Sequence, residues 1–402
     1  MVVESAAPSL SGGLAARLSF AGLILARTSV SLQYQDITVL EFDAGGTPHL
    51  APAQIGLLLT LYTMFGLPAA ILSPLVAQRV NAVTPICLSL LLMTAGQLAM
   101  IAPQSFTSLI ICRVLTGLGG SLVYIMALDA VATLAGFGGL ATRMGLIAAT
   151  WPLGNALALV LAYPVAASAG TAFALSLPVC TALPAVALLS WRATPWPAAR
   201  SVPAATPLAL GPFLRRWLET LSLTWPVGLA FALYNTAFVL FTSLSAPLFV
   251  DQGYSPAAAG RLASMPMWLF LISVPAGGLI GTHLRVGHKT LIAAGCLGSA
   301  AGFVLAWMHS AGGLWVALAG ILGGIPTAPL LTLVVERARR FAGLAYGTMF
   351  ATFFAAMLVL PLSVGWLIGE LGTQALVGAL VVLLVLPVII VGATIRRWQS
   401  AP

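Results

Sequence analysis

The stretch Ile111-Cys112-Arg113-Val114-Leu115-Thr116-Gly117-Leu118-Gly119-Gly120-Ser121 places an arginine inside an otherwise apolar segment that runs from about 107 to 131. An arginine at the centre of a membrane helix costs roughly 2.5–3.5 kcal/mol, so it is kept mainly where the protein interior receives it. Gly117, Gly120 and Tyr124 follow Arg113 at helical spacing and form a strip that allows close helix contact. The stretch therefore predicts a packed membrane helix that faces a polar interior.

The composition of the whole chain agrees with this prediction. The 402 residues are 60% hydrophobic and only 6% charged, whereas a soluble domain has roughly 25% charged residues. Apolar segments of about 20 residues, long enough to cross a hydrocarbon core, recur along the chain. We therefore expect an all-α polytopic membrane protein with twelve spans. They cover approximately residues 15–41, 51–77, 83–102, 107–131, 139–166, 169–191, 221–248, 256–282, 289–308, 312–335, 341–369 and 373–395.

Basic residues gather on one side of this predicted topology, the side shared by the two termini. Positive residues favour the cytoplasmic side, so we expect both termini in the cytoplasm and the protein in the inner (plasma) membrane. The basic composition then reflects orientation in the lipid bilayer and does not indicate nucleic-acid binding. The basic residues on this side are Arg17, Arg79, Arg143, Arg192, Arg200, Arg215, Arg216, Arg285, Lys289, Arg337, Arg339, Arg340, Arg396 and Arg397.

The longest connection between predicted spans contains Pro203, Pro207 and Pro212 and divides the chain. Proline at this density is typical of a linker. We expect an N-terminal six-helix bundle at 1–191, a cytoplasmic linker at 192–220 and a C-terminal six-helix bundle at 221–402. Weak similarity between the halves, such as prolines at the starts of spans 2 and 8, indicates a repeat architecture with its site at the midplane.

Twelve spans, two halves and three short motifs make the chain resemble the major facilitator superfamily. The span 4 motif Arg-x-x-x-Gly-x-Gly-Gly is present from Arg113 to Gly120. The loops Pro74–Asn81 and Leu284–Lys289 resemble the family's loop between spans 2 and 3 and its counterpart in the second half, with Arg79 and Arg285 retained but Gln78 in place of the usual aspartate. The resemblance implies transport by alternating access and assigns conformational gating to Arg79, Arg285 and Asp129, with Arg79 paired to Asp129. The alternative is that Arg79 caps a helix end.

Span 1 carries the second arginine inside an apolar segment. Arg27, Ser31, Tyr34 and Gln35 fall on one stripe of an α-helix, which membrane helices keep away from lipid. We interpret this stripe as a substrate-binding face; the alternative is polar packing, with Arg27 extended towards the surface. Other candidates lie on spans that usually line the cavity of such transporters, and each could equally be a packing residue. They are Arg113, Trp151, Asn155, Asn235 and Trp268.

The positions of the acidic residues determine which class of substrate we predict. All nine lie at span ends or in loops, so neither Arg27 nor Arg113 is expected to have an acidic partner at its own depth. Such arginines would need water, carbonyls or an anionic ligand, and a guanidinium suits a planar oxyanion. We therefore expect a monomeric secondary active transporter of a small organic or inorganic anion. The alternatives are efflux of lipophilic compounds and a non-transporting membrane sensor or assembly protein.

Other chemistry is not indicated by the sequence. No titratable carboxylate or histidine is expected deep in the transport path, so the sequence suggests no proton carrier. There is no phosphate-binding loop, no metal-ligand spacing and no nucleophile and base pair at membrane depth. We therefore expect no cofactor, no metal and no enzymatic activity.

Overall fold

The computed structural model describes residues 10–41, 50–76, 83–101, 105–133, 140–191, 210–308, 312–338 and 342–400. These residues are helical, and no strand occurs in the ranges described. The N-terminal half contains α1 (Leu10–Gln35), η1 (Asp36–Glu41), α2 (Pro52–Thr63), α3 (Gly66–Val76), α4 (Val83–Ala99), α5 (Phe106–Thr133), α6 (Leu140–Ala169), α7 (Thr171–Ser176) and α8 (Val179–Ser190).

The C-terminal half contains α9 (Leu210–Leu244), α10 (Ala246–Asp251), α11 (Pro256–His283), α12 (His288–Met308), α13 (Gly312–Gly324), α14 (Thr327–Arg337), α15 (Ala342–Leu371) and α16 (Gln374–Ser400). It also consists of long helices, but its broken pair, α13 with α14, stands at a different place from those of the N-terminal half. Residues 210–220, expected in the linker, are helical as the start of α9. The domain division itself remains a prediction, because residues 192–209 lie outside the described part.

Each of the twelve expected spans coincides with one long helix or with a pair of consecutive helices. The pairs are α2 with α3, α7 with α8 and α13 with α14. The last two are interrupted just before Pro178 and Pro326, where the proline ring cannot donate a backbone hydrogen bond. Ten of the spans are long and apolar enough to cross a membrane among the residues described; α4 is a shorter apolar helix, and α1 carries the polar stripe. The expected all-α polytopic architecture is confirmed.

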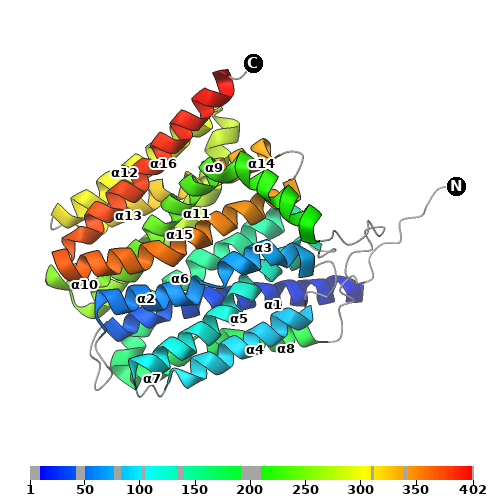
Figure 1. Ribbon diagram of the computed structural model, residues 1–402. Coiled ribbons are helices and arrows are strands. Elements are labelled where there is room, and N and C mark those ends of the chain that lie inside the picture. Colours follow the sequence, from blue (N-terminus) through cyan, green and yellow to red (C-terminus); the bar gives the residue numbers. More distant parts are fainter. Residues whose placement is uncertain are drawn as a thin grey trace.

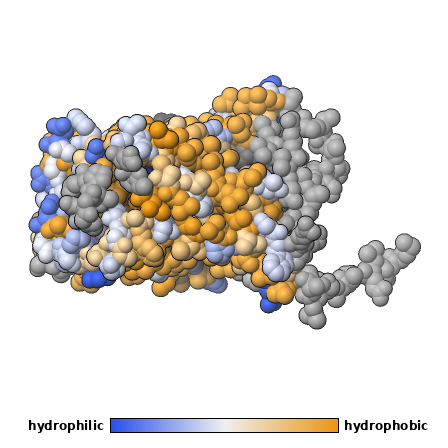
Figure 2. All heavy atoms as spheres, turned by 90° about the horizontal axis from the view of Figure 1, so that it is seen from below, coloured by the Kyte–Doolittle hydropathy of each residue, from blue (hydrophilic) through white to orange (hydrophobic). Residues whose placement is uncertain are grey.

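The two halves lie side by side with their helices roughly along a common direction (Figure 1). The blue to blue-green helices of the N-terminal half occupy the lower part of the view, and the green to red helices of the C-terminal half the upper part. A broad band of hydrophobic side chains covers the face shown in Figure 2, with hydrophilic atoms gathered towards its two ends. This surface suits a protein surrounded by lipid.

Helices α2 and α15 form the longest contact between the halves, and α6 packs on α11 (Figure 1). Small residues allow these approaches: a Cβ on Gly365 would lie 2.5 Å from the carbonyl oxygen of Pro52, and a Cβ on Gly260 would meet the ring of Tyr163. At the last residue of α1, Gln35 Nε2 donates to the Thr242 carbonyl at 2.9 Å and Ser243 Oγ donates to Gln35 Oε1 at 3.1 Å. The halves are therefore joined at the end of the bundle opposite Leu10.

Candidate functional site

Arg113 lies near the middle of the N-terminal half and is completely buried. Its guanidinium donates to the carbonyls of Gln33 and Tyr34 at 2.6 Å each and to the Leu58 carbonyl at 3.2 Å. Because α1 ends at Gln35, the first two carbonyls belong to its last turn, where regular helical hydrogen bonds stop and the helix dipole is negative. Arg113 therefore caps the end of α1 and ties α1 and α2 to α5.

An acidic partner of Arg113 is also present, contrary to the expectation from the sequence. Asp36 Oδ1 lies 3.8 Å from Arg113 Nη1, and both side chains are buried. Asp36 stands on the helical face opposite Arg27, and this face is the one directed towards α5 and α4. The expectation that Arg113 lacks an acid at its depth is wrong, and so is the expectation that no carboxylate is deeply buried.

Polar side chains surround this ion pair. Gln97 Nε2 donates to Asp36 Oδ2 at 2.5 Å and to the Leu175 carbonyl at 2.6 Å, and Gln33 Nε2 donates to Gln97 Oε1 at 2.7 Å. The ring of Tyr62 lies 4.5 Å below the Arg113 guanidinium, and its hydroxyl donates to the Val30 carbonyl at 3.0 Å. These contacts compensate much of the cost of burying the charges.

Two glycines of the segment 111–121 allow α2 to pack closely on α5 beside Arg113. A Cβ on Gly117 would lie 2.5 Å from the carbonyl oxygen of Tyr62, and one on Gly120 would collide with the Tyr62 ring. The flat strip expected from the sequence is confirmed. Its effect is to place the aromatic ring of Tyr62 beside the guanidinium.

Arg27 is equally buried but has fewer partners. Its Nη1 donates to the Tyr124 carbonyl at 2.9 Å, and its Cζ lies 3.8 Å from the centre of the Tyr124 ring. Its Nε has no hydrogen-bond partner among the described residues. The interpretation that Arg27 extends to the surface is therefore wrong, because the side chain is only 2% exposed. A buried guanidinium with an unused donor has capacity for an anionic ligand.

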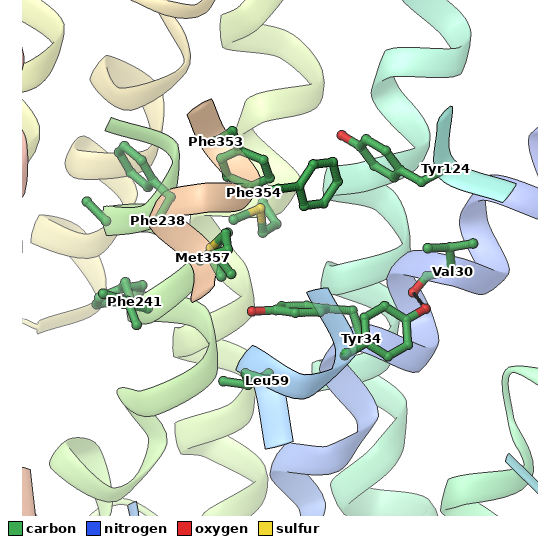
Figure 3. Close-up of a cluster of buried hydrophobic side chains, with 14 of the residues drawn as sticks. Val30, Tyr34, Leu59, Tyr124, Phe238, Phe241, Phe353, Phe354 and Met357 are labelled. Carbon is green, nitrogen blue, oxygen red and sulfur yellow. Dashed lines mark hydrogen bonds between the residues drawn. The ribbon is translucent and has the colours of Figure 1, made fainter. Parts of the chain in front are cut away.

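A cluster of aromatic rings continues from Arg27 across the boundary between the halves. We call Tyr34, Tyr124, Trp151, Phe231, Phe350, Phe353 and Phe354 the central aromatic cluster. Trp151 lies 5.4 Å from both Tyr34 and Tyr124, and Tyr124 lies 5.9 Å from both Phe350 and Phe354 of α15, measured between ring centres. Figure 3 shows Tyr124 directed towards Phe353 and Phe354. Tyr124 therefore links the buried guanidinium to the C-terminal half.

The remaining predicted substrate residues occupy different surroundings. Ser31 Oγ donates to the Arg27 carbonyl at 3.1 Å, and Asn155 Nδ2 donates to the Trp151 carbonyl at 2.8 Å, so both are next to the cluster. Asn235 is half-buried and donates to the Phe231 carbonyl at 3.0 Å. Gln35 bonds across the halves as described above. Trp268 lies apart from this group, on an exposed stripe of α11 with Ile272 and Leu279.

The predicted gating residues are only partly within the described structure. Arg79 and the side chain of Asp129 lie outside it, so their pairing remains a prediction. Arg285 is exposed after the end of α11 and has a positive φ of 53°, in the left-handed region that residues with a Cβ rarely adopt. Its placement on a turn agrees with a connecting loop.

Comparison with known proteins identifies the family. The family model of the Major Facilitator Superfamily matches residues 12–283, so the chain belongs to this superfamily. No curated protein matches the chain significantly.

Among solved structures, the chain is similar to a peptide transporter POT in complex with sulfate, with a TM-score of 0.73 and 14% identity over 95% of this chain and 94% of that one. It is also similar to a POT family transporter in complex with 5-aminolevulinic acid, with a TM-score of 0.72 and 11% identity over 94% and 95% of the two chains. At these identities the similarity establishes the fold. The chain is thus a multi-pass membrane protein of the transporter class, as the sequence motifs indicated.

Sequence reasoning missed several residues of the site. In the sequence, Asp36, Gln33 and Gln97 share no motif, and Tyr62 is a single aromatic residue of span 2. Phe350 and Phe354 lie in an apolar segment without a polar signal. The spacing of Asp36 on the face opposite Arg27 was the available clue, since that face also has to contact a neighbouring helix.

Proposed function

We propose that the protein is a secondary active transporter of a small organic or inorganic anion. It works by alternating access as a monomer in the inner (plasma) membrane, with both termini in the cytoplasm. The observation that carries this proposal is the buried guanidinium of Arg27, with its unpartnered Nε and its position beside the boundary of the halves. Burying an uncompensated charge is costly, so an oxyanion would complete the coordination of Arg27.

Alternating access is supported by the contacts between the halves. The bonds of Gln35 with Thr242 and Ser243 join the halves at the end opposite Leu10, while Tyr124 meets Phe350 and Phe354 nearer the middle of the helices. Rocking of one half would break these contacts and expose Arg27 to one side of the membrane at a time.

We assign proton coupling to the pair of Asp36 and Arg113. Protonation of Asp36 would remove the ion pair but leave Arg113 its three carbonyl acceptors, so α5 stays attached to α1 and α2. The hydrogen bond from Gln97 would lose its charged acceptor, which changes the contact between η1 and α4. A proton on Asp36 thus acts at the point where three elements of the N-terminal half meet.

Asp36→Asn tests this assignment. The variant mimics the protonated state, so uptake driven by a pH gradient should fall to the level without a gradient, whereas exchange of labelled for unlabelled substrate should persist. Both rates are measured in proteoliposomes. Gradient-driven uptake that survives in Asp36→Asn would exclude Asp36 as the coupling group.

A second candidate function is efflux of lipophilic compounds, which the central aromatic cluster favours because it presents rings from both halves. A non-transporting sensor is the third possibility. The three functions differ in what stabilises the protein and in whether bound solute crosses the membrane.

The deciding experiment compares Arg27→Gln with Arg143→Gln. Arg143 is a matched control, since it is also buried and its Nε and Nη1 have no partner among the described residues. We expect anions to raise the melting temperature of wild type and Arg143→Gln but not of Arg27→Gln. In liposomes, we likewise expect wild type and Arg143→Gln to take up the anion and Arg27→Gln not to. Stabilisation of all three by lipophilic compounds alone would favour efflux, and binding without uptake would favour a sensor.

A further inference from the structure

Resting on the proposed anion site at Arg27, we propose that the transported solute is an organic monoanion with an aromatic body. Its carboxylate would bind Arg27, and its ring would lie between Tyr124 and the phenylalanines of α15. The inference narrows the substrate class and excludes inorganic oxyanions and dianions as preferred cargo. Two observations support the inference: the distribution of charged side chains around Arg27 and the aromatic rings next to it.

Of the two buried arginines at the centre of the molecule, only Arg27 has unused capacity to bind a substrate. Arg113 is committed to Asp36 and to three backbone carbonyls, and its guanidinium also contacts the Tyr62 ring. Arg27 has one carbonyl acceptor and an unpartnered Nε among the described residues. A ligand with one negative charge neutralises Arg27, whereas a second charge would have no counterpart beside it.

The other buried arginine with unused donors lies too far along its helix to share such a ligand. Arg143 precedes Trp151 by two helical turns, or about 12 Å along α6 at 1.5 Å per residue. Trp151 is the residue of α6 that contacts Tyr34 and Tyr124. A small dianion bound at Arg27 would therefore not reach Arg143.

The wall opposite Arg27 carries no charge. Residues 220–250 and 341–369, which include the inner parts of α9 and α15, contain no Asp, Glu, Lys, Arg or His. This wall is formed by part of the central aromatic cluster, namely Phe350, Phe353 and Phe354 of α15 and Phe231 of α9. Figure 3 shows Phe353 and Phe354 side by side. A charged or strongly hydrated group placed there would lose water without gaining partners.

The same wall suits an aromatic ring. The Arg27 guanidinium lies over the Tyr124 ring, and Tyr124 packs edge to face on Phe350 and Phe354. When the halves separate, the edge of Tyr124 and the rings of α15 become free to contact a ring of the cargo in the same geometry. A carboxylate attached to that ring by a short chain would then reach Arg27.

The first arm of the test uses ligands that change one group at a time on purified wild-type protein. The probes are 3-phenylpropionate, propionate, 3-phenylpropanamide, phenylsuccinate and sulfate, with Kd measured by calorimetry and thermal shift. Burial of a phenyl group should make 3-phenylpropionate bind about 10- to 100-fold more tightly than propionate. Compared with 3-phenylpropionate, three ligands should each bind at least about tenfold more weakly. The amide lacks the charge, phenylsuccinate carries a second carboxylate, and sulfate has no ring.

The second arm uses variants that separate the two ends of the ligand. Arg27→Gln should weaken 3-phenylpropionate and propionate by the same factor, because both lose the carboxylate contact. Phe350→Leu keeps an apolar side chain of similar size and should weaken only the phenyl-bearing ligand, by about three- to tenfold. Arg143→Gln is the control and should leave both affinities unchanged.

The outcomes separate this inference from the proposed function. Equal or tighter binding of sulfate, propionate or phenylsuccinate, lost in Arg27→Gln, would overturn the aromatic monoanion and keep an anion transporter. Equal binding of the amide and the carboxylate, unaffected by Arg27→Gln, would overturn the anion site as well. Failure of 3-phenylpropionate to bind wild type at millimolar concentration would also overturn the inference.

Discussion

Arg113 and Arg27 are two buried arginines in the same half of the molecule, yet their surroundings are opposite. Arg113 is held by three carbonyls, one carboxylate and one ring from α1, η1 and α2. Arg27 has one carbonyl and one ring, both from Tyr124, and an orphan Nε among the described residues. The comparison teaches that two equally buried arginines can differ in unused hydrogen-bonding capacity, and Arg27 combines such capacity with a position beside the boundary of the halves.

The largest effect on stability is expected from removal of each guanidinium, and this effect tests the comparison. Arg113→Leu leaves Asp36 buried without its counter-charge and three carbonyls without their donor, so the free energy of unfolding should fall by about 3–5 kcal/mol. Arg27→Leu removes a charge that is poorly compensated, so its effect should stay within about 1 kcal/mol. Thermal unfolding in detergent measures both.

Addition of Asp36→Asn to Arg113→Leu should recover part of the loss, because the uncompensated carboxylate is then neutral. This double variant also separates the ion pair from the carbonyl contacts. Equal destabilisation by Arg113→Leu and Arg27→Leu would contradict the distinction between a fully partnered and an incompletely partnered buried arginine.

An intermediate effect on stability is expected from substitution of Gly117, the glycine that keeps Tyr62 beside Arg113. In Gly117→Ala the new Cβ would lie 2.5 Å from the Tyr62 carbonyl oxygen, so α2 must shift and the free energy of unfolding should fall by about 1–3 kcal/mol. Gly145→Ala is the control, since nothing lies within 4 Å of a Cβ there, and the better helix former should be neutral or slightly stabilising. Matching losses at the two glycines would show that close packing on α5 is unimportant.

The smallest effect is expected at Gln35, which belongs to the boundary of the halves and to neither guanidinium. Gln35→Leu removes two hydrogen bonds between α1 and α9, worth about 0.5 kcal/mol each, and should shift the population away from the state closed at this end. Spin labels at Leu98 and Leu371, both exposed near the end opposite Leu10, report the change in distance distribution. Gln252→Leu, at an exposed position within the C-terminal half, should leave the distribution unchanged; a change of equal size there would remove the special role of Gln35.

Much of the fold was predictable from local features of the chain. The scarcity of charge and the repeated apolar segments predict a helical membrane protein, because only helices satisfy their own backbone within lipid when no barrel pattern is present. The motif from Arg113 to Gly120 indicated both the superfamily and a tightly packed span, and the matches to the family and to transporter structures confirm this. The stripe of Arg27, Ser31 and Tyr34 was correctly placed in the interior.

The candidate site was less predictable because its contacts join distant parts of the sequence. Arg113 reaches partners that precede it by 55 to 80 residues, and Arg27 reaches one that follows it by 97. Most of these partners are backbone carbonyls, which every residue carries, so no residue type signals them. The ion pair with Asp36 depends on how α1 and α5 cross.

The sequence by itself therefore determined the class of the protein, its twelve apolar segments and the presence of two arginines that must be enclosed. Periodicity and hydrophobicity are local properties, and they suffice for these conclusions. Only the tertiary structure decided which arginine is satisfied, which side chains meet across the halves and where uncharged aromatic rings of α15 meet Tyr124 beside Arg27. Those features arise from helix crossings, where small residues set the distance and distant carbonyls supply the partners.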